Sequence, residues 1–257
     1  MKALRVAALA LAAGLAAPGA AATDLRLLSA GAVELGLTPA LAVFERESGH
    51  VVRVEFAAAP ALAGRFQAPP GYDAVIAPPA VLDTLARAGA VGSERVGVGK
   101  VGIGVAVRPG VAPPDIGSVE ALRQSLLGAD SVAFNRASTG LYVEKLIVRL
   151  GVADAVNAKA TRHPDGASVM QHLLASSRPN EFGLGAITEI VLFKEQGLKL
   201  VGPLPAAVQN YTSYLASTAA PGADAARASA TATLLRFLDS PRARRIFADV
   251  GIEAATP

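Results

Sequence analysis

The sequence predicts an α/β protein with largely parallel sheets, and three features point to that class. Short apolar runs rich in Val, Ile and Leu alternate with stretches of helical periodicity from Asp24 onward, which is the pattern of strands joined by crossover helices. Glycines close several of the helical stretches. Turns of small residues join strand to helix, at the carboxyl edge of the sheet where such folds bind ligands.

The first 22 residues have the composition of a secretory signal peptide. Lys2 and Arg5 form a positive beginning, Val6 to Leu15 an apolar core, and Ala20 to Ala22 a small-residue cleavage site. The apolar core is too short to span a bilayer comfortably, and no later stretch is long and charge-free enough to do so. We therefore expect an exported protein that begins near Thr23 and has no membrane span.

The composition argues against nucleic acid and disulfides. Without Lys2 and Arg5, 22 of the 24 basic residues remain against 21 acidic ones, so the mature chain carries a net charge of +1. The chain has no basic run interspersed with aromatic residues, which proteins that bind RNA or single-stranded DNA would need. The chain has no cysteine, which excludes disulfides and a lipid-modified cysteine. About 235 mature residues are enough for one large or two small domains.

The first strand-helix unit runs from Asp24 to Gly49. Leu25, Leu27 and Leu28 supply the strand, a turn of small residues from Ser29 to Ala32 follows, and apolar residues then recur at helical spacing. The first N–H groups of a helix have no internal partner, and small side chains leave them open to an anion. The alternative is an ordinary turn in which Ser29 caps the helix.

Two further units complete the first series. Val51 to Phe56 is a strand, Ala57-Ala58-Ala59-Pro60 is a second turn of small residues, and a short helix follows before the break at Gln67 to Tyr72. Asp73 to Ala77 is a buried strand, after which Pro78-Pro79 starts a helix that Gly89 ends.

A long strand that bears glycines is expected from Val96 to Arg108. Residues 97–102 match the dinucleotide pattern GxGxxG, but that motif must leave a strand and open a helix. Here the apolar alternation simply continues. We therefore predict a bendable crossover segment and no nucleotide cofactor.

The second series repeats the strand, turn and helix order. Ser118 caps a helix, and the strands and helices that we expect after it are Ser131 to Phe134, a helix around Tyr142 to Leu150, Asn157 to Arg162, a helix from Asp165 to Ser176, Glu181 to Gly185, a helix with Glu189, and Leu198 to Gly202. The chain then returns through Tyr211 to Ala216 and ends in two helices, Ala223 to Leu238 and Pro241 to Val250.

The residues of the usual catalytic and metal sites are not grouped. The three histidines are scattered, with no HExxH pattern, and neither a G-x-S-x-G elbow nor a Walker loop is present. What remains is four small turns at strand-helix junctions, near Ser29, Ala58, Ser138 with Thr139, and Ala186 with Thr188. In a doubly wound fold such junctions can converge on one cleft, and neutral N–H and O–H donors there would hold an anion. We expect no catalytic residue, metal or cofactor.

Several blocks of the mature chain resemble the molybdate-binding branch of periplasmic ABC-transporter solute-binding proteins. They are LxxLSAGA with FExxSGHxVxVxF, DAVIAPPAVLDTLARAG, GIGVAVRPGVAPPDI, SVAFNRASTGLYVEKLIVRLG and LVGPLPAAVQNYTSYLAS. The resemblance implies a two-lobed periplasmic binding protein type 2 fold, each lobe a mostly parallel sheet flanked by helices, joined by two crossover segments. Residues 23–104 with 205–257 would form lobe 1, and residues 105–204 lobe 2.

The resemblance also implies a monomeric protein of the periplasm, a binding site and partners. A small anion, a molybdate-like oxyanion or a small carboxylate, would bind between the lobes and be presented to a membrane permease. The candidate ligand-binding residues are Ser29, Ala30, Gly31, Ala58, Arg136, Ser138, Thr139, Gly140, Tyr142, Ala186, Ile187 and Thr188.

This sequence departs from the family pattern at the second turn. The family ordinarily carries a serine there, whereas Ala57-Ala58-Ala59 leaves only N–H groups, which puts molybdate itself in question. Arg136 suits bidentate recognition of a carboxylate, or it pairs with an acidic residue on the surface. Tyr142 either caps the cleft or packs in the core.

The block ASTGLY, residues 137–142, also resembles the periplasmic aconitate isomerases. This likeness implies an alternative, an enzyme that interconverts cis- and trans-aconitate. Such an isomerase needs a base to move an allylic proton, and Glu189 or Glu144 could supply one. We interpret both as carboxylates on the surface of a helix, because nothing nearby in the sequence marks a raised pKa.

Overall fold

The computed structural model describes residues 22–222 and 224–255. Apart from Ala22, the predicted signal peptide lies outside these residues. The strands are β1 Asp24–Ala30, β2 Val51–Ala57, β3 Ala74–Ala77, β4 Val96–Val107, β5 Ser131–Asn135, β6 Ala160–His163, β7 Glu181–Ala186, β8 Lys199–Pro203 and β9 Tyr211–Thr218. The helices are α1 Glu34–Ser48, α2 Ala59–Gln67, α3 Pro79–Arg87, α4 Val119–Gly128, α5 Ser138–Arg149, α6 Ala153–Asn157, α7 Gly166–Ala175, α8 Ile187–Leu192, α9 Ala225–Leu238 and α10 Pro241–Asp249, with single 3-10 turns η1 Gly31–Val33, η2 Lys194–Gln196 and η3 Ala206–Val208.

The strands form one continuous mixed sheet, in the order β2-β1-β3-β9-β4-β7-β5-β6, with β8 beside β4. The predicted α/β class is therefore confirmed. The parallel pairing that we predicted holds at both ends, where β1 pairs with β2 and β3, and β5 with β6 and β7. It is wrong in the middle, because β4 pairs antiparallel with β9, β7 and β8.

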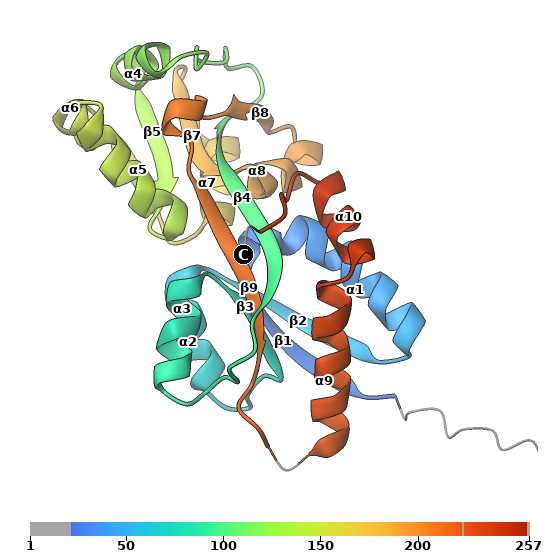
Figure 1. The fold of residues 1–257 in the computed structure, drawn as a ribbon. Coiled ribbons are helices and arrows are strands. Elements are labelled where there is room, and N and C mark those ends of the chain that lie inside the picture. Colours follow the sequence, from blue (N-terminus) through green and yellow to red (C-terminus); the bar gives the residue numbers. More distant parts are fainter. Residues whose placement is uncertain (1–21, 223, 256–257) are drawn as a thin grey trace, which may run out of the picture.

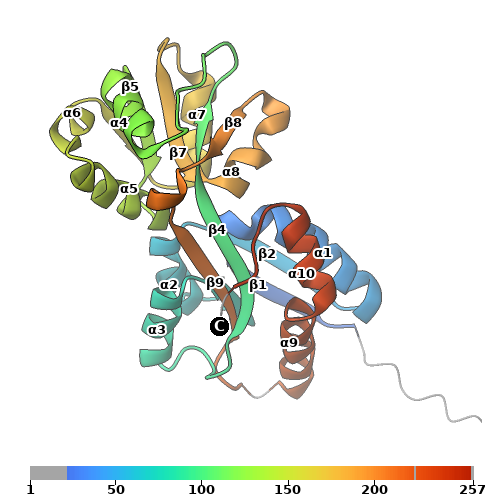
Figure 2. The same cartoon turned by 45° about the horizontal axis from the view of Figure 1, so that its top comes forward.

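β4 and β9 run side by side through the centre of the molecule (Figures 1 and 2). The first half of β4, from Val96 to Gly102, pairs with β9, and the second half, from Ile103 to Ala106, pairs with β7. The long strand predicted from Val96 to Arg108 is thus confirmed as β4. The GxGxxG match lies wholly inside β4, away from any helix start, so it lacks the context of a dinucleotide fingerprint.

The apolar core is divided at the middle of β4. Buried residues from Leu25 to Val101 and from Tyr214 to Ile252 form the first core cluster, which Ala186 also joins. Two further clusters use residues between Ile103 and Val208. In Figure 1, α2 and α3 lie on one side of the strands of the first cluster, and α1, α9 and α10 on the other. No helix of the described residues is long and apolar enough to cross a bilayer.

The helices begin in two different ways. Four of them have a capping side chain, since Ser118, Asp165, Asp224 and Ser240 accept hydrogen bonds from the first turns of α4, α7, α9 and α10. The predicted cap at Ser118 is confirmed. In contrast, η1, α2, α5 and α8 begin after Ala30, Ala58, Ala137 and Ala186, which offer no side-chain cap. These are the four small turns that the sequence singles out.

One predicted strand begins too early. The strand expected from Asn157 to Arg162 is in fact preceded by the short helix α6, and β6 starts only at Ala160. Val152 and Val156, four residues apart, are both buried, so this stretch has helical rather than strand periodicity.

Candidate functional site

A cavity of about 390 Å³ lies where the first core cluster meets the other two. From the first cluster's side it is lined by the ends of β1 and β2, the starts of η1 and α2, and Tyr214 of β9. From the other side it is lined by the end of β5, the starts of α5 and α7, and by α8 and η2. Parallel strands thus deliver their carboxyl ends and following helix starts to one place, as the sequence predicts for a binding site.

Five of the predicted site residues line this cavity. They are Ala30, Gly31, Ala58, Ser138 and Thr139, and the helix starts that follow three of the four small turns therefore meet there. The backbone N–H groups of Ala59, Ser138 and Thr139 have no acceptor among the described residues. Thr139 is only 6% exposed, and its hydroxyl is likewise without a partner in that part of the chain. These groups are available to a bound solute.

Four predicted residues lie elsewhere. Ser29 is buried in β1, where its hydroxyl donates to the carbonyl of Ala30 (3.2 Å), because strand alternation points the side chain away from the turn. Arg136 is exposed and does not line the cavity. The hydroxyl of Tyr142 donates to the Val208 carbonyl (2.7 Å), outside the cavity. Gly140 is buried, and a side-chain carbon there would meet the Asn135 carbonyl oxygen at 1.5 Å.

The fourth small turn approaches the cavity without lining it. Ala186 packs in the first core cluster, and Ile187 is partly buried in the first turn of α8. The buried hydroxyl of Thr188 donates to the carbonyl of Ala32 (2.5 Å). That bond joins α8 to η1 across the division of the core.

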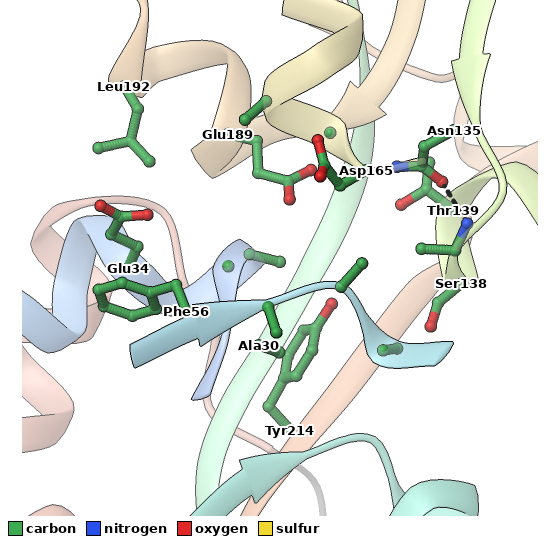
Figure 3. Close-up of a pocket in the computed structure, with 18 of the residues that line it drawn as sticks. Ala30, Glu34, Phe56, Asn135, Ser138, Thr139, Asp165, Glu189, Leu192 and Tyr214 are labelled. Atoms are coloured by element: carbon green, nitrogen blue, oxygen red, sulfur yellow. Dashed lines mark hydrogen bonds between the residues drawn. The ribbon is translucent and has the colours of Figure 1, made fainter. Parts of the chain in front are cut away.

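Glu189 is the residue that sequence reasoning interpreted wrongly. It is partly buried and lines the cavity, and Figure 3 shows its carboxyl pointing inward. The pKa of Glu189 is raised to about 7, mainly because burial penalises the charged form, and the charges of Asp165 and Glu34 add to this effect. The Ala186 backbone opposes it through a hydrogen bond. Glu144 agrees with the surface interpretation, since it pairs with Arg162 (2.6 Å).

Two more carboxyl groups line the cavity beside Glu189. Burial raises the pKa of Glu34, which has neither a hydrogen-bond nor an ion-pair partner among the described residues. Asp165 accepts a hydrogen bond from the Ser168 backbone N–H (2.8 Å) as the cap of α7. The cavity has no Lys, Arg or His among its described lining residues. In the same part of the chain, no group of three His, Cys, Asp or Glu residues is arranged to hold a metal ion.

Asn135 and Tyr214 are further lining residues that the sequence did not reveal. The Asn135 side-chain oxygen accepts from the N–H groups of Ala137 and Gly140, both at 3.0 Å, which fixes the start of α5 and leaves the amide nitrogen to donate. Tyr214 is 4% exposed. Burial and the nearby charge of Glu189 raise the pKa of its hydroxyl, so it remains a neutral donor.

A signal for Glu189 was present in the sequence. Glu189 follows the predicted helix start at Ala186 by three residues, the position from which a glutamate reaches back to the N-cap backbone. The position of the helix therefore implied a carboxyl beside the turn. Glu34 and Tyr214 gave no such signal, because only the packing of distant strands brings them together.

Comparison with known proteins agrees with this architecture. The chain is 28% identical over 242 residues to an aconitate isomerase from a Pseudomonas species, covering 90% of this chain and 88% of that protein. Its structure is similar to that of the periplasmic molybdate-binding protein of Azotobacter vinelandii, with a TM-score of 0.71, 16% identity, and 91% and 99% of the two chains covered.

A second solved structure has the same fold. The sulfate-binding protein SubI of Mycobacterium tuberculosis matches with a TM-score of 0.71 and 15% identity, over 91% of this chain and 88% of that one. A family model described as bacterial extracellular solute-binding protein matches residues 25–253. This protein therefore belongs to the bacterial extracellular solute-binding protein family.

Proposed function

We propose that this protein captures a small organic carboxylate in the cavity and presents it to the permease of an ABC transporter. The observation that carries the proposal is the meeting of uncapped helix starts, after Ala30, Ala58 and Ala137, at one cavity. Helix N-termini attract anions by about 0.3–1 kcal/mol each, and hydrogen bonds to a charged group contribute about 1.5–3 kcal/mol each. After ordering and desolvation costs, several such contacts are sufficient for the roughly 8 kcal/mol of a micromolar site.

The division of the core supports a two-lobed molecule that closes on its solute. Lobe 1 would comprise residues 23–104 and 205–257, and lobe 2 residues 105–204. The core clusters divide between Val101 and Ile103, close to the proposed boundary. β4 and β9 would be the two crossover segments, and the closed form would be selected by solute contacts from both sides.

Cavity size favours an organic acid over a tetrahedral oxyanion. A volume of about 390 Å³ lies within the range of pockets for small organic ligands, whereas an oxyanion such as molybdate would leave most of it empty. The second turn also has no hydroxyl, because residues 57–59 are all alanine. Export to the periplasm, through the predicted signal peptide at residues 1–22, agrees with the family.

Isothermal titration calorimetry tests this proposal. The mature chain should bind at least one of citrate, cis-aconitate and trans-aconitate more tightly than molybdate, tungstate or sulfate. If none of these anions releases or absorbs heat at millimolar concentration, the binding proposal is wrong. Tighter binding of molybdate would restore the oxyanion hypothesis and reject the organic carboxylate.

A second candidate function is the isomerisation of aconitate. It is favoured by Glu189, a cavity carboxyl whose pKa of about 7 suits a general base near neutral pH, and by the aconitate isomerase relative. Glu189 would remove a proton from the methylene carbon of aconitate, the double bond would shift, and the same carboxyl would return the proton to the former vinyl carbon. Tyr214 would remain a neutral hydrogen-bond donor beside the reacting group.

NMR spectroscopy separates the enzyme from the binder. Incubation of cis-aconitate with the protein in D₂O should give trans-aconitate with deuterium at the methylene position if proton transfer occurs. The Glu189→Gln variant should lose this conversion, whereas Glu144→Gln, which changes a surface ion pair, should retain it. The absence of conversion by the unaltered protein at high concentration would eliminate the enzyme.

A further inference from the structure

One side of the cavity carries carboxyl groups and another carries hydrogen-bond donors. This arrangement restricts the kind of solute that fits the cavity. Glu34, Glu189 and Asp165 lie in a row in Figure 3, which we call the acidic wall. Asn135, Ser138, Thr139 and Tyr214, together with the uncapped start of α5, form the donor wall. We propose that the solute is a small carboxylic acid that also carries hydrogen-bond donors of its own, either hydroxyl or ammonium groups. This inference rests on the proposed function and names its substrate class.

The donor wall is built to receive a carboxylate. α5 is 12 residues long, and its first N–H groups, at Ser138 and Thr139, have no acceptor among the described residues. The Thr139 hydroxyl is unpartnered in the same part of the chain, although its residue is only 6% exposed and lines the cavity. This hydroxyl is therefore free to donate to a carboxylate bound in the cavity.

The acidic wall, where ionised, would repel a solute that carries carboxylates alone. No lining cation in the described chain offsets Glu34, Asp165 or Glu189, and the exposed Arg136 does not line the cavity. Each carboxylate accepts hydrogen bonds and donates none when ionised. A solute therefore satisfies the ionised carboxylates of this wall by donating to them, which hydroxyl and ammonium groups do.

The groups around Glu189 come from several helices and strands, and two of them are further carboxyl groups. Asp165 faces it from the start of α7, Glu34 from α1 and Tyr214 from β9, and the Ala186 backbone hydrogen-bonds to it. Tyr214 and the Ala186 backbone are the donors that the protein itself supplies beside Glu189. Asp165 is partly satisfied by the backbone of Ser168, which leaves Glu34 as the acceptor with no partner among the described residues.

A matched series of four-carbon dicarboxylates tests the inference. Succinate has no donor, malate adds one hydroxyl, and aspartate adds one ammonium group to the same skeleton. Calorimetry on the mature chain should show malate or aspartate binding at least tenfold more tightly than succinate. The same comparison between tricarballylate and citrate repeats the test at a larger size. Whichever donor gives the larger gain identifies the source, hydroxyl or ammonium.

The outcomes separate this inference from the proposed function. If succinate and tricarballylate bind as tightly as their substituted analogues, the protein captures carboxylates and the donor requirement is wrong. If no member of either series and no other carboxylate binds, the proposed function itself fails, and the inference with it.

Two isosteric variants test the role of the acidic wall. Glu34→Gln and Asp165→Asn each remove a negative charge without changing the shape of the wall, and asparagine can still cap α7. Each should reduce the preference for malate or aspartate over succinate by about tenfold. Glu94→Gln removes an exposed carboxyl outside the cavity and should leave the preference unchanged. Thermal unfolding of each variant verifies that it is folded, and an unchanged preference in both cavity variants would overturn the inference.

Discussion

Glu189 should make the stability of the folded protein depend on pH between about 4.5 and 7. The pKa of its carboxyl rises from 4.5 to about 7 on folding, chiefly because of burial. At about 1.4 kcal/mol per pKa unit, this change corresponds to about 3.5 kcal/mol of unfolding free energy. The folded protein keeps the proton at pH values where the unfolded chain has released it. The contribution is therefore complete below pH 4.5 and lost as the pH rises through 7.

The Glu189→Gln variant isolates this contribution, because glutamine has nearly the same shape and does not titrate. Urea unfolding of protein and variant without solute, at a series of pH values, gives the unfolding free energy of each. The variant should gain about 3.5 kcal/mol relative to the unaltered protein between pH 4.5 and pH 8. Other titrating groups, such as His163, whose pKa is lowered mainly by burial, act in both proteins and cancel.

Glu195→Gln is the matched control, since Glu195 is exposed and does not line the cavity. It should follow the pH dependence of the unaltered protein. A free-energy difference between Glu189→Gln and the unaltered protein that stays constant from pH 4.5 to pH 8 would show that Glu189 is not held in a charge-disfavouring site. The general-base role suggested for the second candidate function would then also lose its support.

Three other substitutions test the site and the packing around it. Gly140→Ala should destabilise the protein by more than about 3 kcal/mol in urea unfolding, because the added carbon meets backbone at 1.5 Å. Gly64→Ala, in open space on α2, should instead stabilise it by about 0.5–1 kcal/mol, and equal effects would contradict the packing. Ser138→Ala should weaken carboxylate binding by about 1–3 kcal/mol in calorimetry. Ser29→Ala should leave binding unchanged, because the Ser29 hydroxyl is hydrogen-bonded inside β1. The reverse result would show that the solute does not bind beside Ser138. Thr188→Val should cost about 1–3 kcal/mol of unfolding free energy by leaving the Ala32 carbonyl unpaired, and no loss would mean that water replaces the bond.

The regular elements were predictable because their signals are local. Apolar spacing located β4, and Ser118 identified the start of α4. Small residues marked the helix starts after Ala30, Ala58 and Ala137, where a hydroxyl or carboxylate cap would otherwise be usual. These signals belong to a few consecutive residues, so they do not need the fold to be known.

The acidic group that lines the cavity was not predictable in this way. The position of Glu189 three residues after Ala186 implied a carboxyl beside that turn, but no spacing in the sequence indicates that Glu34 and Asp165 share a cavity with it. Ser29 shows the opposite error, since its place beside the turn suggested exposure, whereas the alternation of β1 buries it. The antiparallel centre of the sheet escaped prediction because the direction of β4 relative to β7, β8 and β9 depends on how distant segments of the chain fold back.

The position of β9 sets a condition on how the chain can fold as it is made. β9 lies between β3 and β4 in the sheet, so Ala74 finds its partner at Thr218, far along the chain. The ribosome must therefore have synthesised most of the polypeptide before β3 can pair with β9. Pairing between strands so far apart in the sequence is slow. A nascent chain that ends before residue 211 would leave the edge of β3 bare and open to association with other chains.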